Sequence, residues 1–178
     1  MSTFELVHGS CADQVVDVVV NAANRHLFAG GGICGVIFRK AGASDLAEAC
    51  SQIHTPVNDG SAVITPSFGM TNCKGIVHAV GPDFSRTPRA FEELCLAYYN
   101  SLVVLMENGY HSISFPLISA GIFGGDLADA PGESTKQCIR AYRKFCADNP
   151  SYEISVKLCA FTPAEMRSAS AVCEEFGV

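Results

Sequence analysis

Residues 21–38 read NAANRHLFAGGGICGVIF and join an apolar run, Val18-Val19-Val20, to an apolar segment that can form a helix. The run has the composition of a buried strand. Three consecutive glycines would weaken a helix or strand by roughly 1 kcal/mol each relative to alanine. We therefore expect a strand, a loop that contains the glycines, and a helix. A loop without side chains can wrap closely around a ligand.

Length and charge limit the classes of function. The chain has 178 residues, of which 48% are apolar, so we expect one domain over residues 1–178 with a sizeable core. The net charge is −6 and the basic residues are scattered. This composition argues against nucleic acid as a partner, because binding to a phosphate backbone needs a basic surface. An anionic ligand would have to be held locally by backbone amides.

The nine cysteines are odd in number and form no C-x-x-C pair. Several stand among apolar residues, which is typical of reduced, buried thiols in the cytoplasm and does not favour disulfides or a zinc site. No leader pattern and no apolar run of about 18 residues is present. We expect a soluble, cytoplasmic monomer with no membrane contact, metal or cofactor, although a segment of a larger polyprotein would look the same.

Strand and helix patterns alternate along the chain. Strands are predicted at residues 3–7, 17–21, 61–67, 74–80, 111–117 and 154–161. Helices are predicted at residues 33–41, from a Ser44 cap to 53, from a Thr87-Pro88 cap to about 108, at 133–147, and after a capping box at Thr162–Glu165. This order predicts an α/β fold, a three-layer α/β/α sandwich with a mixed, partly parallel sheet.

A second glycine-rich loop, at residues 121–125, follows another predicted inner strand. Ligands of open α/β sheets bind beyond the carboxyl ends of the strands, and two such loops with a helix N-terminus near Ile33 can offer N–H groups to a diphosphate. No G-K-[ST] follows either glycine-rich loop, and we expect neither a Rossmann nor a P-loop site. From these turns alone, ligand binding and a structural role both remain open.

Four blocks, in order, resemble the macrodomain family: VNAAN at 20–24, GGGI-x-G at 30–35, H-x-V-G-P at 78–82 and PLISAGIFG at 116–124. The resemblance extends over residues 4–161. It implies the α/β/α fold already predicted and a pocket for ADP-ribose. The implied partner is ADP-ribose or an ADP-ribosylated protein.

The resemblance assigns roles to individual residues. Asn24 would bond the distal ribose through its amide, and Phe161 would stack on adenine. Phe123 would lie beside the distal ribose, while Ile33 and Ile122 would meet across the diphosphate. The remaining implied pocket residues are Ser10, Cys11, Ala22, Gly30, Gly31, Gly32, Ser119, Ala120 and Gly121. The structural alternatives are a turn or cap role for Asn24 and core positions for the two phenylalanines, while Asn21 would tie loop backbone together.

One departure from the family concerns adenine. The family usually shows Gly-Asp-Ile near the first strand, where the carboxylate accepts a bond from the adenine amino group, but this chain has Gly9-Ser10-Cys11. Serine can accept such a bond without a charge. We expect weaker or differently arranged adenine recognition, with Asp13 as a substitute only if its loop folds back.

A second departure concerns catalysis. Members that hydrolyse ADP-ribosyl esters commonly have aspartate where this chain has Cys34, and histidine where it has Phe38. Viral members with a similar Ser-Ala-Gly-Ile-Phe loop lack the aspartate and are still regarded as hydrolases. The resemblance therefore leaves three functions: hydrolysis of mono-ADP-ribosyl esters or O-acetyl-ADP-ribose with Asn24 and Phe123, a reader without activity, or a hydrolase that uses Cys34 as a thiolate.

Four further residues have two interpretations each. His78 stands inside an apolar strand and is expected to be structural rather than catalytic. His26 is either a ribose contact or a solvated loop residue. Asp126 and Asp129 are either rim groups of the pocket or a helix cap.

Overall fold

The computed structural model describes residues 1–178 and contains one six-stranded sheet in the order β1-β6-β5-β2-β4-β3. Strand β3 is an edge strand and pairs antiparallel with β4, whereas every other pair is parallel. The strands are β1 (Thr3–His8), β2 (Val18–Ala23), β3 (Ala62–Pro66), β4 (Gly75–Val80), β5 (Ser112–Pro116) and β6 (Ser155–Ala160). The expected mixed, partly parallel sheet is confirmed.

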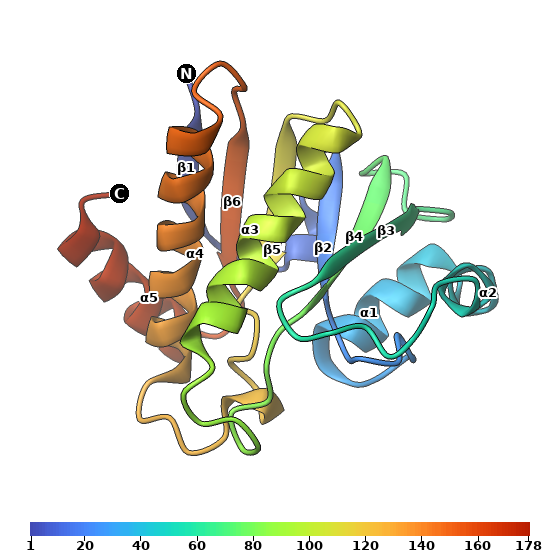
Figure 1. Cartoon of the computed structure of the whole chain (residues 1–178), viewed down its shortest axis with the longest axis horizontal. Coiled ribbons are helices and arrows are strands. Elements are labelled where there is room, and N and C mark those ends of the chain that lie inside the picture. The colour runs from blue at the N-terminus through green and yellow to red at the C-terminus, as the bar shows by residue number, and fades with distance from the viewer.

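Helices cover both faces of the sheet (Figure 1). One face is covered by α3 (Phe91–Glu107), α4 (Ala130–Asp148) and α5 (Pro163–Phe176), the other by α1 (Gly32–Ala41) and α2 (Ala43–Ser51). The larger core, 24 buried residues, lies under α3 and α4, and a second core of 17 lies under α1, α2 and the short 3-10 helix η1 (Cys11–Asp13). These two cores make the three-layer sandwich. No helix is both long and apolar enough to cross a bilayer.

Two predicted helix caps are wrong. Helix α3 begins at Phe91 rather than after Thr87, because the Thr87 hydroxyl donates backwards to the carbonyl of Asp83 at 3.1 Å and so closes a turn. Helix α2 is capped by Gly42, whose carbonyl accepts from Leu46 N at 3.0 Å, rather than by Ser44. Gly42 has φ of +101°, a conformation that favours glycine and lets the chain turn directly from α1 into α2.

Helices α4 and α5 start at side-chain caps. Helix α4 begins at Ala130, three residues before the expected start, because Asp129 accepts a bond from Gly132 N at 3.1 Å. The cap interpretation of Asp129 is therefore correct. The Thr162 cap of α5 is confirmed, since its hydroxyl accepts from Glu165 N at 3.1 Å.

Candidate ligand pocket

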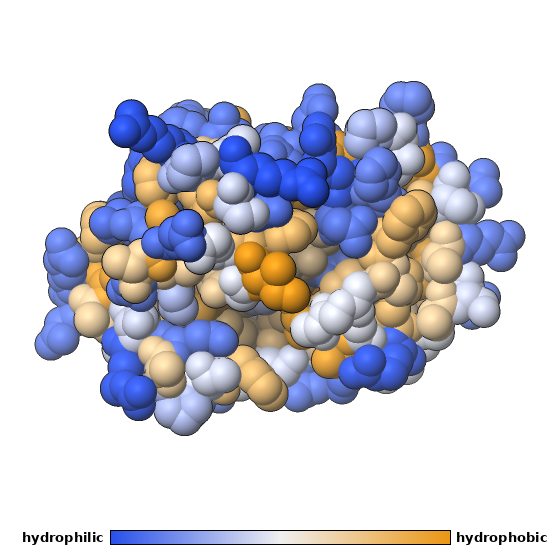
Figure 2. All heavy atoms as spheres, turned by 90° about the horizontal axis from the view of Figure 1, so that it is seen from below, coloured by the Kyte–Doolittle hydropathy of each residue, from blue (hydrophilic) through white to orange (hydrophobic).

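A cavity of about 510 Å³ opens at the carboxyl ends of β2 and β5. This volume is within the range of roughly 300–1,000 Å³ that is usual for small-molecule sites. Figure 2 shows the molecule from this end, with a hollow among apolar residues near the middle of the face. Fourteen residues line the cavity, and none is Asp, Glu, His, Lys or Arg: Ala22, Ala23, Asn24, Gly30, Gly31, Gly32, Ile33, Cys34, Leu117, Ser119, Ala120, Gly121, Ile122 and Phe123.

The fold thus brings most of the predicted site residues around one cavity, from segments almost a hundred residues apart. Ala23 and Leu117 line it as well and were not named from the sequence; their only signal is that they flank predicted residues at two strand ends. Five residues considered from the sequence do not line the cavity: Ser10, Cys11, Phe161, His26 and Asp126. Its walls are glycine backbone and small or apolar side chains.

The loop after β2 is a turn closed by the Asn24 side chain. Asn24 Oδ1 accepts from His26 N at 3.1 Å and from Phe28 N at 3.0 Å, and Nδ2 donates to the Phe28 carbonyl at 2.8 Å. Leu27 adopts φ of +58° and buries its side chain in the core under α1. The Asn24 amide therefore closes the turn, as the turn interpretation expected. Asn24 also lines the cavity, and its contact with the distal ribose stays a prediction.

Cys34 connects this turn to the start of helix α1. Its thiol donates to the Phe28 carbonyl at 3.6 Å and accepts from Asn21 Nδ2 at 3.7 Å. The side chain is 5% exposed at the cavity wall. With its proton directed at a carbonyl, the thiol acts here as a weak hydrogen-bond donor that ties the loop together.

A buried polar chain lies behind Cys34. Asn21 Nδ2 is 3.1 Å from His78 Nδ1, and His78 Nε2 is 3.0 Å from Thr65 Oγ1. Since an amide nitrogen only donates, His78 Nδ1 accepts and the ring proton sits on Nε2. The Asn21 amide thus bonds two side chains rather than the loop backbone we expected, and its Oδ1 is buried without a partner. His78 is fully buried and does not line the cavity.

Burial lowers the pKa of His78 to about 4, from an ordinary value of 6.5. Between pH 4 and pH 6.5, His78 is therefore protonated in the unfolded chain and neutral in the folded chain. We expect the free energy of unfolding to fall by about 3 kcal/mol from this group as the pH drops from 6.5 to 4, and to be unaffected by it above 6.5. Urea unfolding at several pH values would measure the loss, which the variant His78→Gln should lack. Equal pH dependence in the two proteins would contradict the assignment.

The second loop is held by the segment that contains the H-x-V-G-P block. Ser119 adopts φ of +58° and its hydroxyl donates to the Pro82 carbonyl at 2.7 Å. Phe84 N donates to the Phe123 carbonyl at 2.8 Å. Within η2 (Ile122–Gly124), Phe123 is half-buried, whereas Ile122 is 95% exposed at the cavity mouth. This loop presents backbone and one free apolar side chain to the cavity.

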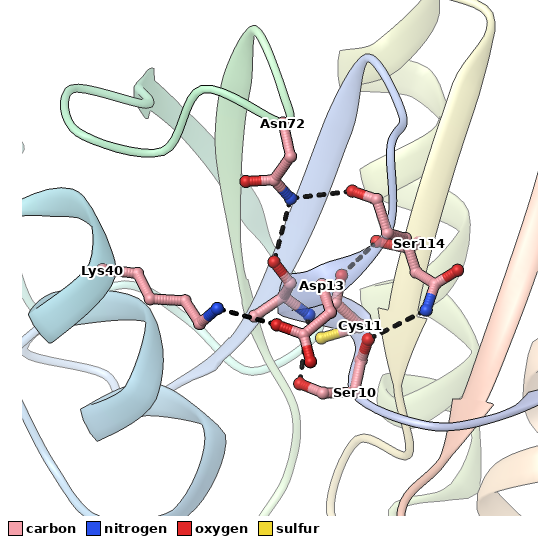
Figure 3. Close-up of polar contacts among 8 residues, drawn as sticks. Ser10, Cys11, Asp13, Lys40, Asn72 and Ser114 are labelled. Carbon is pink, nitrogen blue, oxygen red and sulfur yellow. Dashed lines mark hydrogen bonds and ion pairs between the residues drawn. The ribbon is translucent and has the colours of Figure 1, made fainter.

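The segment after β1 forms a separate cluster of polar contacts that packs against α1, β2 and β5 (Figure 3). Ser10 Oγ accepts from Ala12 N at 3.3 Å, and Cys11 is 1% exposed, with burial raising the pKa of its thiol. The Asp13 carboxylate forms an ion pair with Lys40 of α1, with 2.7 Å between Oδ1 and Nζ. The same figure shows the Ser114 hydroxyl donating to the Cys11 carbonyl.

Phe161 stands next to this cluster, because Gly9 N donates to the Ala160 carbonyl at 2.9 Å. It is 69% exposed and is therefore not the core residue that one interpretation gave. Ser10 and Phe161 thus lie together beyond β1 and β6, on one side of the cavity. Their role toward a base remains a prediction.

Comparison with known proteins gives consistent matches. The family model described as Macro domain matches residues 20–132. A protein of Fusobacterium nucleatum without a known function is 43% identical over 137 residues, which are 76% of this chain and 74% of the relative. A protein of Citrobacter koseri named O-acetyl-ADP-ribose deacetylase is 40% identical over 127 residues, 69% of this chain and 71% of the relative.

Solved structures agree. The Oceanobacillus iheyensis macrodomain with ADP superimposes with a TM-score of 0.88 at 28% identity, covering 98% of this chain and 92% of that one. The Trypanosoma brucei macrodomain in complex with ADP-ribose gives a TM-score of 0.80 at 27% identity, covering 94% and 68% of the two chains.

Proposed function

The chain belongs to the Macro domain family, and from this premise we propose that it binds ADP-ribose and hydrolyses O-acetyl-ADP-ribose. The observation that carries the proposal is the uncharged cavity between two glycine-rich loops, in a chain 40% identical to a named deacetylase of this metabolite.

The cavity suits a diphosphate because backbone can approach it closely. Four glycines line the cavity without placing a side chain on its wall: Gly30, Gly31, Gly32 and Gly121. A Cβ added at Gly31, Gly32 or Gly121 would have no atom within 4 Å. Helix α1 begins at Gly32 and directs its positive end toward the same loop. An acidic protein with no basic residue in the cavity can hold an anion in this way.

We infer the orientation of the ligand from the positions of these residues. We assign the adenine end to the side of Ser10 and Phe161, and the distal ribose to the side of Asn24 and Phe123. Ile33 is half-buried and lines the first loop, opposite the exposed Ile122 of the second. The diphosphate would then lie between the loops.

Hydrolysis needs only a water molecule held beside the ester. Water adds to the acetyl carbonyl carbon, the bond from that carbon to the ribose oxygen breaks, and the proton from water passes to the leaving oxygen, giving acetate and ADP-ribose. No carboxylate or imidazole lines the cavity, so we propose that loop backbone and substrate phosphate orient the water. The same chemistry applies to mono-ADP-ribosyl esters of Asp and Glu on proteins.

A reader without activity is the second candidate. It is favoured by Cys34, which stands where the hydrolytic members of the family commonly have aspartate. Its thiol proton is directed at the Phe28 carbonyl, so the structure shows it as a link between loop and helix. A hydrolase that uses Cys34 as a thiolate would have to break this bond.

All nine cysteines are free, and seven of them are buried. This state supports the proposal that the protein works in the cytoplasm, where thiols stay reduced.

Calorimetry and product analysis together test the proposal. We expect ADP-ribose to bind about tenfold or more tightly than AMP, with ADP between them, because the diphosphate and distal ribose contact the two loops. Liquid chromatography of O-acetyl-ADP-ribose incubated with the protein should show conversion to ADP-ribose. Tight binding without conversion would establish the reader, and equal or absent binding of all three nucleotides would refute the pocket.

The Cys34→Ala variant distinguishes the two hydrolytic mechanisms in the same assay. Conversion that survives this substitution excludes the thiolate. Conversion lost while ADP-ribose binding is kept would support the thiolate instead.

A further inference from the structure

A second hollow, of about 300 Å³, lies on the other side of the turn at residues 24–28. It is lined by His26 and Phe28 from the turn, by Ala47 and Cys50 from α2, and by Ile53 and Thr55 from the segment after α2. It contains no Asp, Glu, Lys or Arg. Its volume is at the lower end of the range for small-molecule sites, roughly 300–1,000 Å³, so it suits one side chain better than a whole ligand.

The sheet order places this hollow at one end of the ligand pocket. Phe161 and Ser10 follow β6 and β1 on one side of β2, whereas α2 packs against β3 on the other side. The proposed orientation puts adenine toward Phe161, so the distal ribose ends at the Asn24 turn. Asn24 lines the pocket, whereas His26 to Ala29 line the second hollow, so this turn lies between the proposed distal ribose and the hollow.

The rim of the hollow carries exposed aromatic surface. Phe28 is 69% exposed and stacks on His26, with ring centroids 5.6 Å apart and an interplanar angle of 23°. Across the mouth of the main cavity, Ile122 is 95% exposed. A contiguous exposed apolar patch beside a binding site is typical of surfaces that contact a further molecule.

The hollow is also preformed. Asn24 closes the turn through three hydrogen bonds, and the buried Leu27 fixes it in the core. Val57 N donates to the Arg25 carbonyl at 2.7 Å and ties the turn to the segment beyond α2. A surface that is already ordered costs little conformational entropy on binding.

We propose that this hollow binds an apolar side chain of the polypeptide that carries the ADP-ribosyl group, close in sequence to the modified residue. The inference rests on the proposed function, because a polypeptide attached to the distal ribose has to leave the pocket across the Asn24 turn. The uncharged lining selects an apolar residue over a charged one. The hollow would make ADP-ribosylated proteins with such a neighbour preferred ligands over free ADP-ribose.

The test compares peptides joined to ADP-ribose through a non-hydrolysable linkage and identical except for Leu or Gly beside the modified position. We expect the wild-type protein to bind the Leu peptide about tenfold more tightly than the Gly peptide. Ala47→Gln, which places a larger side chain from α2 into the hollow, should remove this preference and leave the affinity for free ADP-ribose within twofold. Ala43→Gln is the matched control, because Ala43 is exposed on the same helix outside the hollow and should keep the preference.

The outcomes are distinguishable. Equal affinity of wild-type protein for the two peptides, or a preference that Ala47→Gln does not change, would overturn the inference while ADP-ribose binding keeps the proposed function intact. Failure of the wild-type protein to bind ADP-ribose at all would overturn both. Dissociation of a dimer by Ala47→Gln would assign the hollow to a second copy of the chain and so also overturn the inference.

Discussion

Replacing Gly35 by alanine is expected to reduce the affinity for ADP-ribose by more than tenfold. A Cβ at this position would lie 2.6 Å from the carbonyl oxygen of Gly30 and 3.3 Å from Arg39 Nη1. The Gly30 oxygen is backbone of the glycine loop at residues 30–32 and can move only if that loop moves. Isothermal titration with ADP-ribose would measure the loss, and thermal unfolding should show a destabilisation of about 1–3 kcal/mol, as for other overpacked sites.

Gly31→Ala provides the control for stability. Gly31 is in the same loop, has φ of −85°, and a Cβ there would meet no atom within 4 Å. Its free energy of unfolding should therefore stay close to that of the wild-type protein. If Gly35→Ala bound ADP-ribose as well as the wild-type protein, the close contact between α1 and the loop would have no part in shaping the pocket.

The second large effect is expected from Asn24→Ala, which removes all three hydrogen bonds that close the turn. We expect affinity for ADP-ribose to fall about tenfold to a hundredfold, since each lost bond contributes about 1 kcal/mol and the cavity wall loses its shape. Amide hydrogen exchange should speed up at His26 and Phe28, whose N–H groups lose their acceptor. Calorimetry and exchange measured on one preparation would show both effects.

The Asn24→Asp variant separates the turn from a direct ligand contact. Aspartate keeps an oxygen that accepts from His26 N and Phe28 N, but it has no N–H for the Phe28 carbonyl. We therefore expect hydrogen exchange close to that of the wild-type protein. If binding is also close to wild type, Asn24 acts mainly through the turn. If binding falls as far as in Asn24→Ala while exchange stays slow, the amide contacts the ribose directly, or the added charge repels the diphosphate.

Rescue by salt distinguishes these two explanations of weak binding. Repulsion between a carboxylate and a diphosphate is screened as ionic strength rises, with a Debye length of about 10 Å at 0.1 M and about 3 Å at 1 M. The loss of a neutral hydrogen bond is not screened. Affinity of Asn24→Asp that recovers at high salt relative to the wild-type protein would identify repulsion.

Local patterns in the sequence were sufficient for the fold class and the family. Alternating strand and helix periodicities predicted the α/β/α sandwich, and the glycine runs at 30–32 and 121–125 indicated where backbone, rather than side chains, would meet a ligand. Both depend on residue types within a few positions of one another. The expected inner strands were found for the same reason, because the apolar runs of β2, β4, β5 and β6 are largely buried in the sheet.

Helix starts and the hydrogen-bond partners of side chains were harder to predict from the sequence. Thr87-Pro88 has the composition of a cap, yet Thr87 bonds backwards to Asp83. Gly42 rather than Ser44 caps α2, because α1 ends at that residue and the chain has to turn at once. The start of a helix therefore depends on where the preceding turn or helix ends. The residue preferences at the cap position do not contain this information.

By itself, the sequence determined that two glycine-rich loops leave inner strands and that neither Lys nor Arg stands within residues 30–35 or 121–125. Only the tertiary structure decided what the polar residues of the first loop do. Asn21 meets a histidine 57 positions away, and the Cys34 thiol and Asn24 amide share the Phe28 carbonyl. The reason is physical: periodicity and glycine content act over a few residues, whereas the partner of a buried polar group is chosen by whichever distant strand or turn the fold brings within about 3–4 Å.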